Sequence, residues 1–361
     1  ESPDGETIQL ERPTTGQLGD YRILHELGRG GFGIVYEATH VATGNHVALK
    51  MLPAGFADSQ LQNAERLHKF RREFRSLADI NHPNLVGMQS LEVAGEQWFF
   101  TMDLVEGVDF KTYVRPQGQL VESRLRQTLP QLVAGIMALH AQQIVHRDLK
   151  PGNVLITHEG HVQILDFGLV VELEQRTDIT ASYRSMNFVG TPAYAAPEQV
   201  SGQRTAASDW YAVGVMLYES LTGELPFQGS PIEILTKKQS HDPPSLLGRA
   251  GVPDDLAQLT MELLRRESDQ RPASLLIAQA TSADQADAES GHVGDLVMIG
   301  RESQLAELAQ IQGKFLQDRQ PSAIFISGRS GEGKTTLIEH FLNPLKRRND
   351  LVVLSGRCYD R

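Results

Sequence analysis

The chain has few of the features that mark secreted or membrane proteins. Cys358 is its single cysteine among 361 residues, so no disulfide can form within the chain and a disulfide-stapled secreted scaffold is excluded. No apolar run approaches the ~20 residues that a membrane-spanning helix needs, and no secretory signal opens the sequence. We therefore expect a cytoplasmic protein with no membrane segment in this stretch. Because it begins with Glu1, we interpret it as part of a longer chain.

The sequence also has no excess of basic residues. Lys and Arg number 34 against 45 Asp and Glu, which gives a net charge of −11 and argues against a generic nucleic-acid binder. Hydrophobic residues at 40% and charged residues at 22% are typical of a soluble protein with a sizeable core. Since typical domains have about 100–150 residues, two or more units are expected.

One short segment combines groups suited to phosphoryl transfer. Residues 146–153 lie between a helix-like apolar run (132–139) and a strand-like run (154–156), and they read H-R-D-L-K-P-G-N. Asp148 can accept a hydroxyl proton, Lys150 can stabilise charge on a phosphoryl group, and Asn153 can offer an oxygen to Mg²⁺. Thirteen residues later, Asp166 is a second candidate metal ligand, followed by Phe167 and the hinge-like Gly168.

In this order, the two segments resemble the H-R-D-L-x-x-x-N catalytic loop and the D-F-G motif of eukaryotic-type protein kinases. A polar turn with solvated acids would explain a lone H-R-D, but not the ordered pair. The resemblance extends from about residue 21 to 280. It implies an α+β, bilobal fold, with a small β-rich N-lobe over 20–104 and a larger helical C-lobe over 105–280.

A glycine-rich segment lies near the start of the ordered chain. Gly28, Gly30 and Gly33 form a G-x-G-x-x-G, a spacing that dinucleotide-binding folds share. Residues 34–36 continue as a strand rather than a helix, so the glycines are expected at a hairpin turn. There the backbone N–H groups can approach phosphates. A purely structural glycine hairpin remains an alternative on this motif alone.

The next strand ends in Lys50, and residues 47–50 resemble the kinase V-A-I-K motif. The resemblance implies that Lys50 holds the α- and β-phosphates of ATP and pairs with a glutamate on the following helix. That helix is expected over 63–79. Its candidates are Glu65 and, as the better match, Glu73, for which an exposed i, i+4 partner on a charged face is the alternative.

The resemblance also implies the pocket for the adenine. Residues 103–107 resemble the hinge between the lobes, whose backbone hydrogen-bonds the base, and Met102 borders the back of the pocket. The side chains that line it are Leu27, Val35, Ala48, Met102, Leu104 and Leu155.

After Gly168 a hydroxyl-rich stretch resembles an activation loop, closed by the G-T-x-x-Y-x-A-P-E of residues 190–198. We expect phosphorylation there to order the loop through Arg147 and raise activity. A solvated loop without a regulatory role is the alternative. The candidate acceptors are Thr177, Thr180, Ser182, Tyr183 and Ser185.

Three residues are expected to shape the C-lobe. Asp209 is implied to anchor the catalytic loop, although a helix N-cap explains it equally well from the sequence. Arg271 is implied to form a structural ion pair with Glu198. Pro130 falls within the helix expected over 125–140, where it predicts a kink or a break.

A second nucleotide-binding motif lies near the C-terminal end. Residues 328–335 form a complete Walker A, G-x-x-x-x-G-K-T, between an apolar strand-like run (323–326) and a helix-like run (336–342). This resembles the opening of a bacterial AAA or STAND-type ATPase domain. Gly328, Gly333, Lys334 and Thr335 are its phosphate-binding candidates, but without a Walker B aspartate hydrolysis is not expected of this segment.

We thus expect a flexible leader (1–19), a kinase domain (20–280), a linker (281–297) and the first part of a P-loop ATPase domain (298–361). The kinase resemblance implies transfer of the γ-phosphoryl group of Mg-ATP, with Mn²⁺ as an alternative ion, to Ser or Thr hydroxyls of proteins. Lys150 and Thr191 favour Ser/Thr over Tyr. The catalytic set is Asp148, Lys150, Lys50 and Glu73, with Asn153 and Asp166 on the metal, and self-association would allow trans-autophosphorylation.

The sequence leaves three alternative functions. A pseudokinase scaffold that only regulates the attached ATPase usually lacks one of Lys50, Asp148 or Asp166, and all three are present. A small-molecule phosphotransferase is disfavoured by the A-P-E segment and the full activation loop. The kinase could also be an input module of a signalling ATPase, which only sequence beyond this chain would decide.

Overall fold

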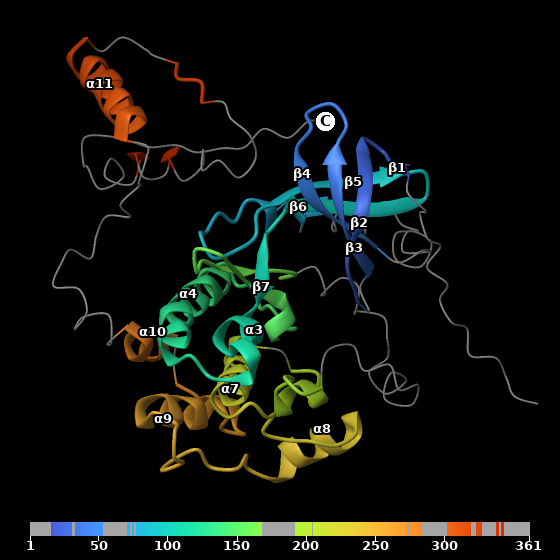
Figure 1. The fold of residues 1–361 in the computed structure, drawn as a ribbon, viewed down its shortest axis with the longest axis vertical. Helices are drawn as coiled ribbons and strands as arrows, with labels where there is room; N and C mark the ends of the chain where they lie inside the picture. The colour runs from blue at the N-terminus through green and yellow to red at the C-terminus, as the bar shows by residue number, and fades with distance from the viewer. Residues whose placement is uncertain are drawn as a thin grey trace, which may run out of the picture.

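The fold is bilobal in the computed structural model, with a twisted sheet above a group of helices (Figure 1). The model describes residues 16–30, 33–52, 71–72, 74–75, 77–167, 192–203, 205–272, 274–282, 302–318, 323–326, 337–338 and 341–342. None of their helices is both long and apolar enough to cross a membrane.

The smaller lobe is a six-stranded antiparallel sheet with the strand order β1-β2-β3-β4-β6-β5. Its strands are β1 (Gln17–Leu18), β2 (Tyr21–Gly30), β3 (Gly33–His40), β4 (His46–Met51), β5 (Met88–Ala94) and β6 (Gln97–Asp103). The hairpin between β2 and β3 confirms that the glycine-rich segment turns between two strands. Helical residues at 71–72, 74–75 and 77–78 lie within the helix expected over 63–79.

The two faces of this sheet bury different cores. Side chains alternate across a strand, so Leu49 and Met51 share one face with Ile34 and Phe99 in a cluster of their own. Ala48 lies on the other face, whose buried residues belong to the main core that continues into the helical lobe. Lys50 has the parity of Ala48, so the pleat turns it toward the junction between the lobes.

The larger lobe is mostly helical. Its elements are α3 (Phe110–Val114), η1 (Pro116–Gly118), α4 (Glu122–Ala141), η2 (Pro151–Asn153), η3 (Pro197–Ser201), α7 (Ala206–Thr222), α8 (Pro231–Ser240), α9 (Asp254–Leu263), η4 (Ser268–Gln270) and α10 (Ser274–Ser282). Every residue from Ser208 to Leu221 is buried, which makes α7 the central helix of this lobe. A small sheet, β7 (Gly107–Asp109), β8 (Val154–Thr157) and β9 (Val162–Ile164), lies beside α4.

The helix α4 passes through Pro130 without a break. A proline in a helix interior removes one hydrogen bond, and the buried side chains on both sides of it, such as Leu129 and Leu132, keep the helix packed on the core. The expected break is therefore wrong, because tertiary packing outweighs the local preference of proline.

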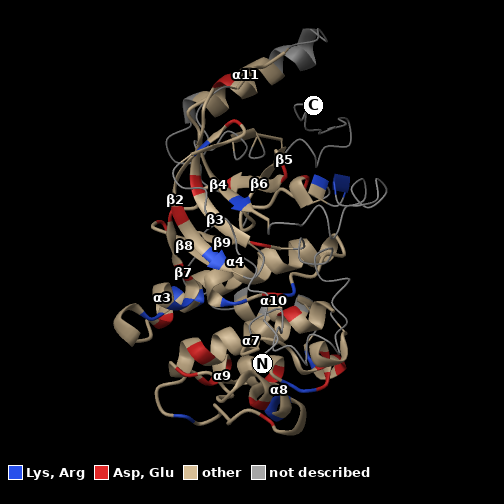
Figure 2. Cartoon of the chain, turned by 90° about the vertical axis from the view of Figure 1, so that its right-hand side faces the viewer, with Lys and Arg blue, Asp and Glu red and all other residues tan. Residues whose placement is uncertain are grey.

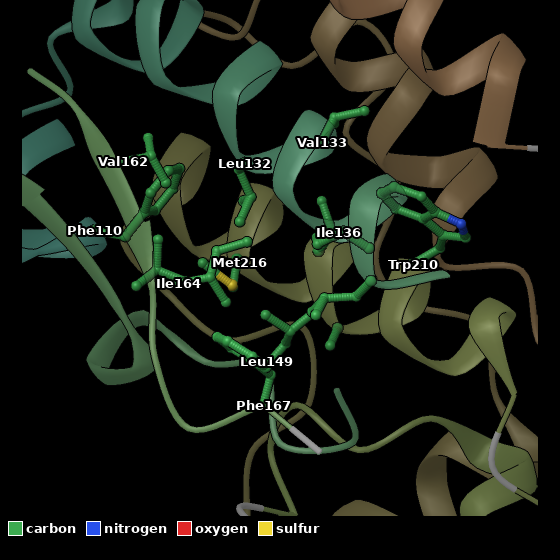
Figure 3. Packing of buried hydrophobic residues seen from close by; sticks show 14 of the residues in the cluster. Phe110, Leu132, Val133, Ile136, Leu149, Val162, Ile164, Phe167, Trp210 and Met216 are labelled. Atoms are coloured by element: carbon green, nitrogen blue, oxygen red, sulfur yellow. The ribbon is translucent and has the colours of Figure 1, made fainter. Parts of the chain in front are cut away.

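The core of the helical lobe reaches the two loops that carry the acidic motifs. Figure 3 shows Leu149 and Phe167 lying together below Leu132 and Ile136 of α4. Leu149 is 2% and Phe167 1% exposed. Burial of these two side chains in one cluster places the backbones of Asp148 and Asp166 near each other.

Charged residues of both signs are distributed over the lobe. Figure 2 shows blue and red segments interspersed among the lower helices.

The described residues of the C-terminal segment include helix α11 (Glu302–Asp318). Residues 323–326, expected as a strand, are not in one, and the Phe325 side chain is 93% exposed. A strand needs a partner for its backbone groups, and none of the described strands pairs with this stretch. Residues 337–338 and 341–342 are helical, as expected.

Candidate active site

The site is built around Asp148, in the loop between α4 and β8. Lys150 donates from Nζ to Oδ2 of Asp148 at 2.7 Å, and Asn153 donates from Nδ2 to the same oxygen at 3.1 Å. Asn153 also donates to the main-chain oxygen of Asp148 at 2.7 Å. The single turn η2 brings Asn153 back to the aspartate, so the sequence spacing and the spatial cluster agree.

Asp209 holds this loop from below. Its carboxylate is 1% exposed and accepts hydrogen bonds from the backbone N–H groups of His146 at 2.8 Å and Arg147 at 2.9 Å. The Nε2 atom of His140 lies 2.8 Å from the same carboxylate. Thr205 is the N-cap of α7, so the interpretation of Asp209 as a cap is wrong. The aspartate instead connects α7 to α4 and the catalytic loop.

Two non-glycine residues of the site have left-handed backbones. Arg147 has a φ of 75° and Asp166 a φ of 56°. Such conformations cost about 1–3 kcal/mol each and persist only where the surroundings impose them. Asp209 fixes the first, and the bond between His146 Nε2 and the Leu165 carbonyl oxygen at 2.8 Å ties the second to the catalytic loop.

Lys50 reaches across from the sheet to Asp166. Its Nζ lies 2.7 Å from Oδ1 of Asp166, and the Lys50 side chain is only 10% exposed. The ammonium also lies 6.0 Å from the centre of the Phe100 ring. A buried cation next to a carboxylate at the junction of the lobes is suited to holding a polyanion together with a metal ion.

The β register gathers the expected nucleotide-binding side chains on one face of the sheet. Val35 pairs with Lys50, and Ala48 pairs with Met102, so these four lie on the face that looks toward the helical lobe. Leu104 and Leu155 are partly buried, whereas Leu27 at the sheet end is 46% exposed.

The glycines of the hairpin differ from one another. Gly33 has a φ of 125°, and a Cβ there would lie 1.9 Å from the Met51 carbonyl oxygen, so only glycine fits. A Cβ at Gly28 or Gly30 would meet nothing within 4 Å. Gly33 is thus required by the fold itself, while open space at Gly28 and Gly30 leaves room for a ligand.

The donor set fits a hard divalent cation. Asn153 uses its amide nitrogen in both hydrogen bonds to Asp148, and its side-chain oxygen is in neither. One carboxylate, from Asp166, and one amide oxygen suit Mg²⁺, which takes few protein ligands when phosphates supply the others. The described residues contain no group of three or more His, Cys, Asp or Glu that could hold a metal by itself.

Glu198 and Arg271 form the expected ion pair in bidentate form, at 2.6 and 2.8 Å. Burial alone would raise the pKa of Glu198, but the Arg271 guanidinium and the Ser208 hydroxyl outweigh it and hold that pKa below its usual value. The guanidinium also lies 4.9 Å from the centre of the buried Tyr211 ring.

The segment before Glu198 makes polar contacts that the sequence did not predict. Tyr194 donates to Glu219 of α7 at 2.6 Å, and Lys111 of α3 donates to the other oxygen of that carboxylate at 2.6 Å. Lys238 of α8 donates to three carbonyl oxygens of the same segment. Tyr194 stands in a recognisable motif, but nothing local marks Lys111 or Lys238.

Several expected site residues lie outside the described residues. They are Glu65, Glu73, Gly168, Thr191, the activation-loop hydroxyls Thr177, Thr180, Ser182, Tyr183 and Ser185, and the P-loop residues Gly328, Gly333, Lys334 and Thr335.

A carboxylate flanked by Lys150 and Asn153, and a buried Lys50–Asp166 pair between a β-lobe and a helical lobe, define a phosphotransferase of the protein kinase class. Comparison with known families agrees: the protein kinase domain model matches residues 21–284, and the chain belongs to this family. The AAA ATPase domain model matches residues 297–361.

Related proteins include bacterial serine/threonine-protein kinases. The chain is 36% identical over 229 residues to serine/threonine-protein kinase PrkC of Bacillus subtilis, covering 63% of this chain and 34% of that protein. It is 36% identical over 281 residues to serine/threonine-protein kinase PkaA of Streptomyces coelicolor, covering 73% and 49%. The chain therefore spans a third to a half of the length of these relatives.

Proposed function

We propose that this protein is an ATP-dependent serine/threonine protein kinase. The observation that carries the proposal is the cluster at Asp148, where Lys150 and Asn153 both touch the carboxylate that would receive a substrate hydroxyl. Family membership and the relatives named serine/threonine-protein kinases support it.

In the proposed mechanism Asp148 orients the substrate hydroxyl and accepts its proton as the oxygen attacks. The side chain is 12% exposed, so the carboxylate is mostly shielded from water and its hydrogen bonds are strong. Lys150, which holds Oδ2 before the reaction, offsets the charge on the transferring phosphoryl group.

The phosphates of ATP are assigned to Lys50 and the backbone of the glycine hairpin. Asn153 and Asp166 would hold Mg²⁺, or Mn²⁺ in its place, and the ion supplies positive charge that neutralises the phosphate oxygens. The face with Val35, Ala48 and Met102 receives the adenine, together with Leu27, Leu104 and Leu155. Glu73 is proposed to take over Lys50 when Asp166 binds the metal.

The substrates are proposed to be proteins, among them a second copy of this chain. Lys150 is placed two residues after Asp148, as in serine/threonine kinases, and the relatives carry that name. The candidate acceptors in this chain are Thr177, Thr180, Ser182 and Ser185.

We retain the proposed organisation of the chain: leader 1–19, kinase domain 20–280, linker 281–297 and an ATPase segment 298–361. The match of the AAA ATPase domain model supports phosphate binding by Gly328, Gly333, Lys334 and Thr335. A pseudokinase scaffold is the second candidate, and the ion pair of Lys50 with Asp166 next to Asp148 disfavours it.

The test is autophosphorylation of the purified protein with Mg²⁺ and labelled ATP. Asp148→Asn keeps the shape of the side chain but accepts no proton, and we expect label incorporation to fall by about 10²–10⁴-fold while ATP binding persists. Lys334→Ala, in the P-loop, is the matched control and should label like the wild type.

The labelling of the wild type, Asp148→Asn and Lys334→Ala distinguishes the candidate functions. Label on Ser or Thr that is lost in Asp148→Asn alone supports the kinase. A wild-type protein that binds ATP and incorporates no label would favour the scaffold, and loss in Lys334→Ala would mean that the P-loop segment is coupled to the kinase.

A further inference from the structure

Lys238 is a buried cation in the last turn of α8, far in sequence from the acidic motifs. It is 1% exposed, whereas its neighbour Lys237 is exposed and donates to the Gln228 carbonyl oxygen at 2.7 Å. Full burial of a lysine is rare unless its charge is compensated. A structural or functional constraint must therefore hold it in place.

The Lys238 ammonium is saturated by backbone carbonyls of one short segment. Nζ donates to the main-chain oxygens of Pro192 at 3.0 Å, Ala193 at 2.6 Å and Ala195 at 2.7 Å. An ammonium has three N–H donors, so all are used. An uncharged aliphatic side chain such as Met could not replace it, because it offers no N–H donors to these oxygens.

No carboxylate pairs with Lys238 among the described residues. Instead, the Nζ atom lies 5.2 Å from the centre of the Tyr211 ring in α7. Arg271 contacts the same ring, but its charge is already matched by Glu198. Within the described residues, the charge of Lys238 is thus stabilised by carbonyl dipoles and an aromatic ring, and burial lowers its pKa to about 7.

The segment that Lys238 holds adjoins the catalytic loop. Residues 192–195 precede η3, and Gln199 of η3 donates to the Arg147 carbonyl oxygen at 3.4 Å, one residue before Asp148. Tyr194 is bound from the other side by Glu219. Residues 192–195 are thus joined through η3 to the loop that carries Asp148.

We propose that Lys238 is a positioning residue for the protein substrate, and that its ammonium shapes residues 192–195 into the surface on which the substrate chain lies next to Asp148. The inference rests on the proposed kinase function and adds a determinant of protein binding to it. Lys238 bonds to the backbone of residues 192–195 and not to the side chains assigned to ATP, so ATP binding should not depend on Lys238.

The proton on Lys238 is part of this role. A neutral amine keeps two N–H donors and turns a lone pair toward the third carbonyl, so deprotonation releases one of the three bonds. Tyr194 and Tyr211 have raised pKa values and Glu198 a lowered one, so these neighbours keep their charge state near neutral pH. The titratable groups on the surrounding elements are Asp209, Tyr211, Tyr218 and Glu219 of α7, Tyr194 and Glu198, Arg271, and Glu233 and Lys237 of α8.

The experiment measures phosphorylation of the Asp148→Asn protein, used as the substrate, by wild type, Lys238→Met, Lys238→Arg and the control Lys237→Met. Loss of three charged hydrogen bonds should raise KM for the protein substrate by at least about tenfold in Lys238→Met, with KM for ATP within about twofold of the wild type. Lys238→Arg, which keeps the charge, should recover part of the loss. Lys237→Met should behave like the wild type.

The pH dependence of kcat/KM distinguishes the proposed role of Lys238 from a purely structural one, which would not produce a step near its pKa. Between pH 6 and 9 the wild-type kcat/KM for the protein substrate should fall as Lys238 loses its proton, and that step should be absent in Lys238→Met. Amide hydrogen exchange of residues 192–203, corrected for the intrinsic pH dependence, should rise over the same range in the wild type. This measurement needs no variant, so it holds even if Lys238→Met does not fold.

An active wild type with unchanged KM for the protein substrate in Lys238→Met would overturn the inference and leave the kinase function intact. Constant amide protection of residues 192–203 from pH 6 to 9 would also overturn it. A wild type without phosphotransfer would instead overturn the proposed function, and the inference with it.

Discussion

Among single residues, Asp209 shapes the geometry of the site through its hydrogen bonds to the catalytic loop and to α4. Its carboxylate receives the N–H groups of His146 and Arg147, and so imposes the left-handed φ of 75° on Arg147. The preceding helix and the catalytic loop could otherwise relax independently. Asp209 therefore determines where Asp148 stands, although it lies about sixty residues further along the chain.

Replacement of this carboxylate should affect stability and turnover together. In Asp209→Asn one oxygen becomes an NH₂ group facing backbone N–H donors, and we expect the free energy of unfolding to fall by about 2–3 kcal/mol. Below the melting temperature, kcat should fall at least about tenfold, because the loop that carries Asp148 loses its anchor. Urea denaturation and steady-state kinetics measure the two effects.

Asp242 offers a matched control for this change. Its side chain is 81% exposed and contacts Arg266 at 2.9 Å. Asp242→Asn should change stability by less than about 1 kcal/mol, as is usual for surface ion pairs. Equal effects of the two substitutions would refute the anchoring role.

Among the elements, the hairpin of β2 and β3 contains glycines with two different roles, one required by the fold and one left for binding. Gly33 lies against the Met51 carbonyl oxygen and needs a positive φ, so it belongs to the fold. Gly28 and Gly30 have open space above them, so their lack of a side chain matters only to something that approaches from outside. The same G-x-G-x-x-G pattern thus contains structural and binding glycines.

The hairpin glycines should respond differently to alanine. Gly33→Ala places a Cβ 1.9 Å from a backbone oxygen, and we expect it to lower the free energy of unfolding by more than about 2 kcal/mol. Gly30→Ala should change stability by no more than about 1 kcal/mol while it raises KM for ATP, if phosphates approach the backbone there. Thermal unfolding and ATP titration compare the two variants directly.

Two outcomes would contradict the expected difference between Gly33→Ala and Gly30→Ala. If both variants bind ATP like the wild type, the hairpin does not cover the phosphates. If Gly33→Ala is as stable as Gly30→Ala, then β3 and β4 can separate without cost at this end of the sheet.

On the scale of the whole molecule, the Glu198–Arg271 ion pair joins two parts of the helical lobe that lie 73 residues apart in the chain. Arg271 also donates to the carbonyl oxygens of Arg265, Arg266 and Ala207, so one guanidinium joins the ends of α7 and α9 to the A-P-E segment. Its side chain is 1% exposed. Removal of one partner would leave a buried charge without compensation.

This pair should make the lobe sensitive to acid. The folded pKa of Glu198 lies below the unfolded value of 4.5, so its contribution to stability is complete above pH 4.5 and is lost as the pH falls through the folded pKa. We expect urea midpoints to decline below about pH 4.5 in the wild type, and Glu198→Gln to be less stable at pH 7 with a shallower decline. An unchanged pH dependence in Glu198→Gln would contradict this account.

The order of the motifs in the sequence was sufficient to predict the bilobal fold, and β3, β4, β8 and the helix α4 lie close to their expected ranges, whereas 323–326 is not a strand. Such elements follow from local patterns, namely the apolar run of β4 that ends in Lys50 and the amphipathic pattern of α4. The cluster of Asp148, Lys150 and Asn153 is also local, since η2 closes it within six residues. These are the parts that the amino-acid sequence determined by itself.

Only the tertiary structure shows the contacts whose partners cannot be identified from the sequence. Asp209 could be an N-cap or an anchor until α7 was placed beneath the catalytic loop, and Pro130 could break α4 until packing held the helix together. The partners of Lys238 are main-chain carbonyls 43 to 46 residues away. Every residue has such a carbonyl, so only the folded arrangement of α8 against residues 192–195 could select these three.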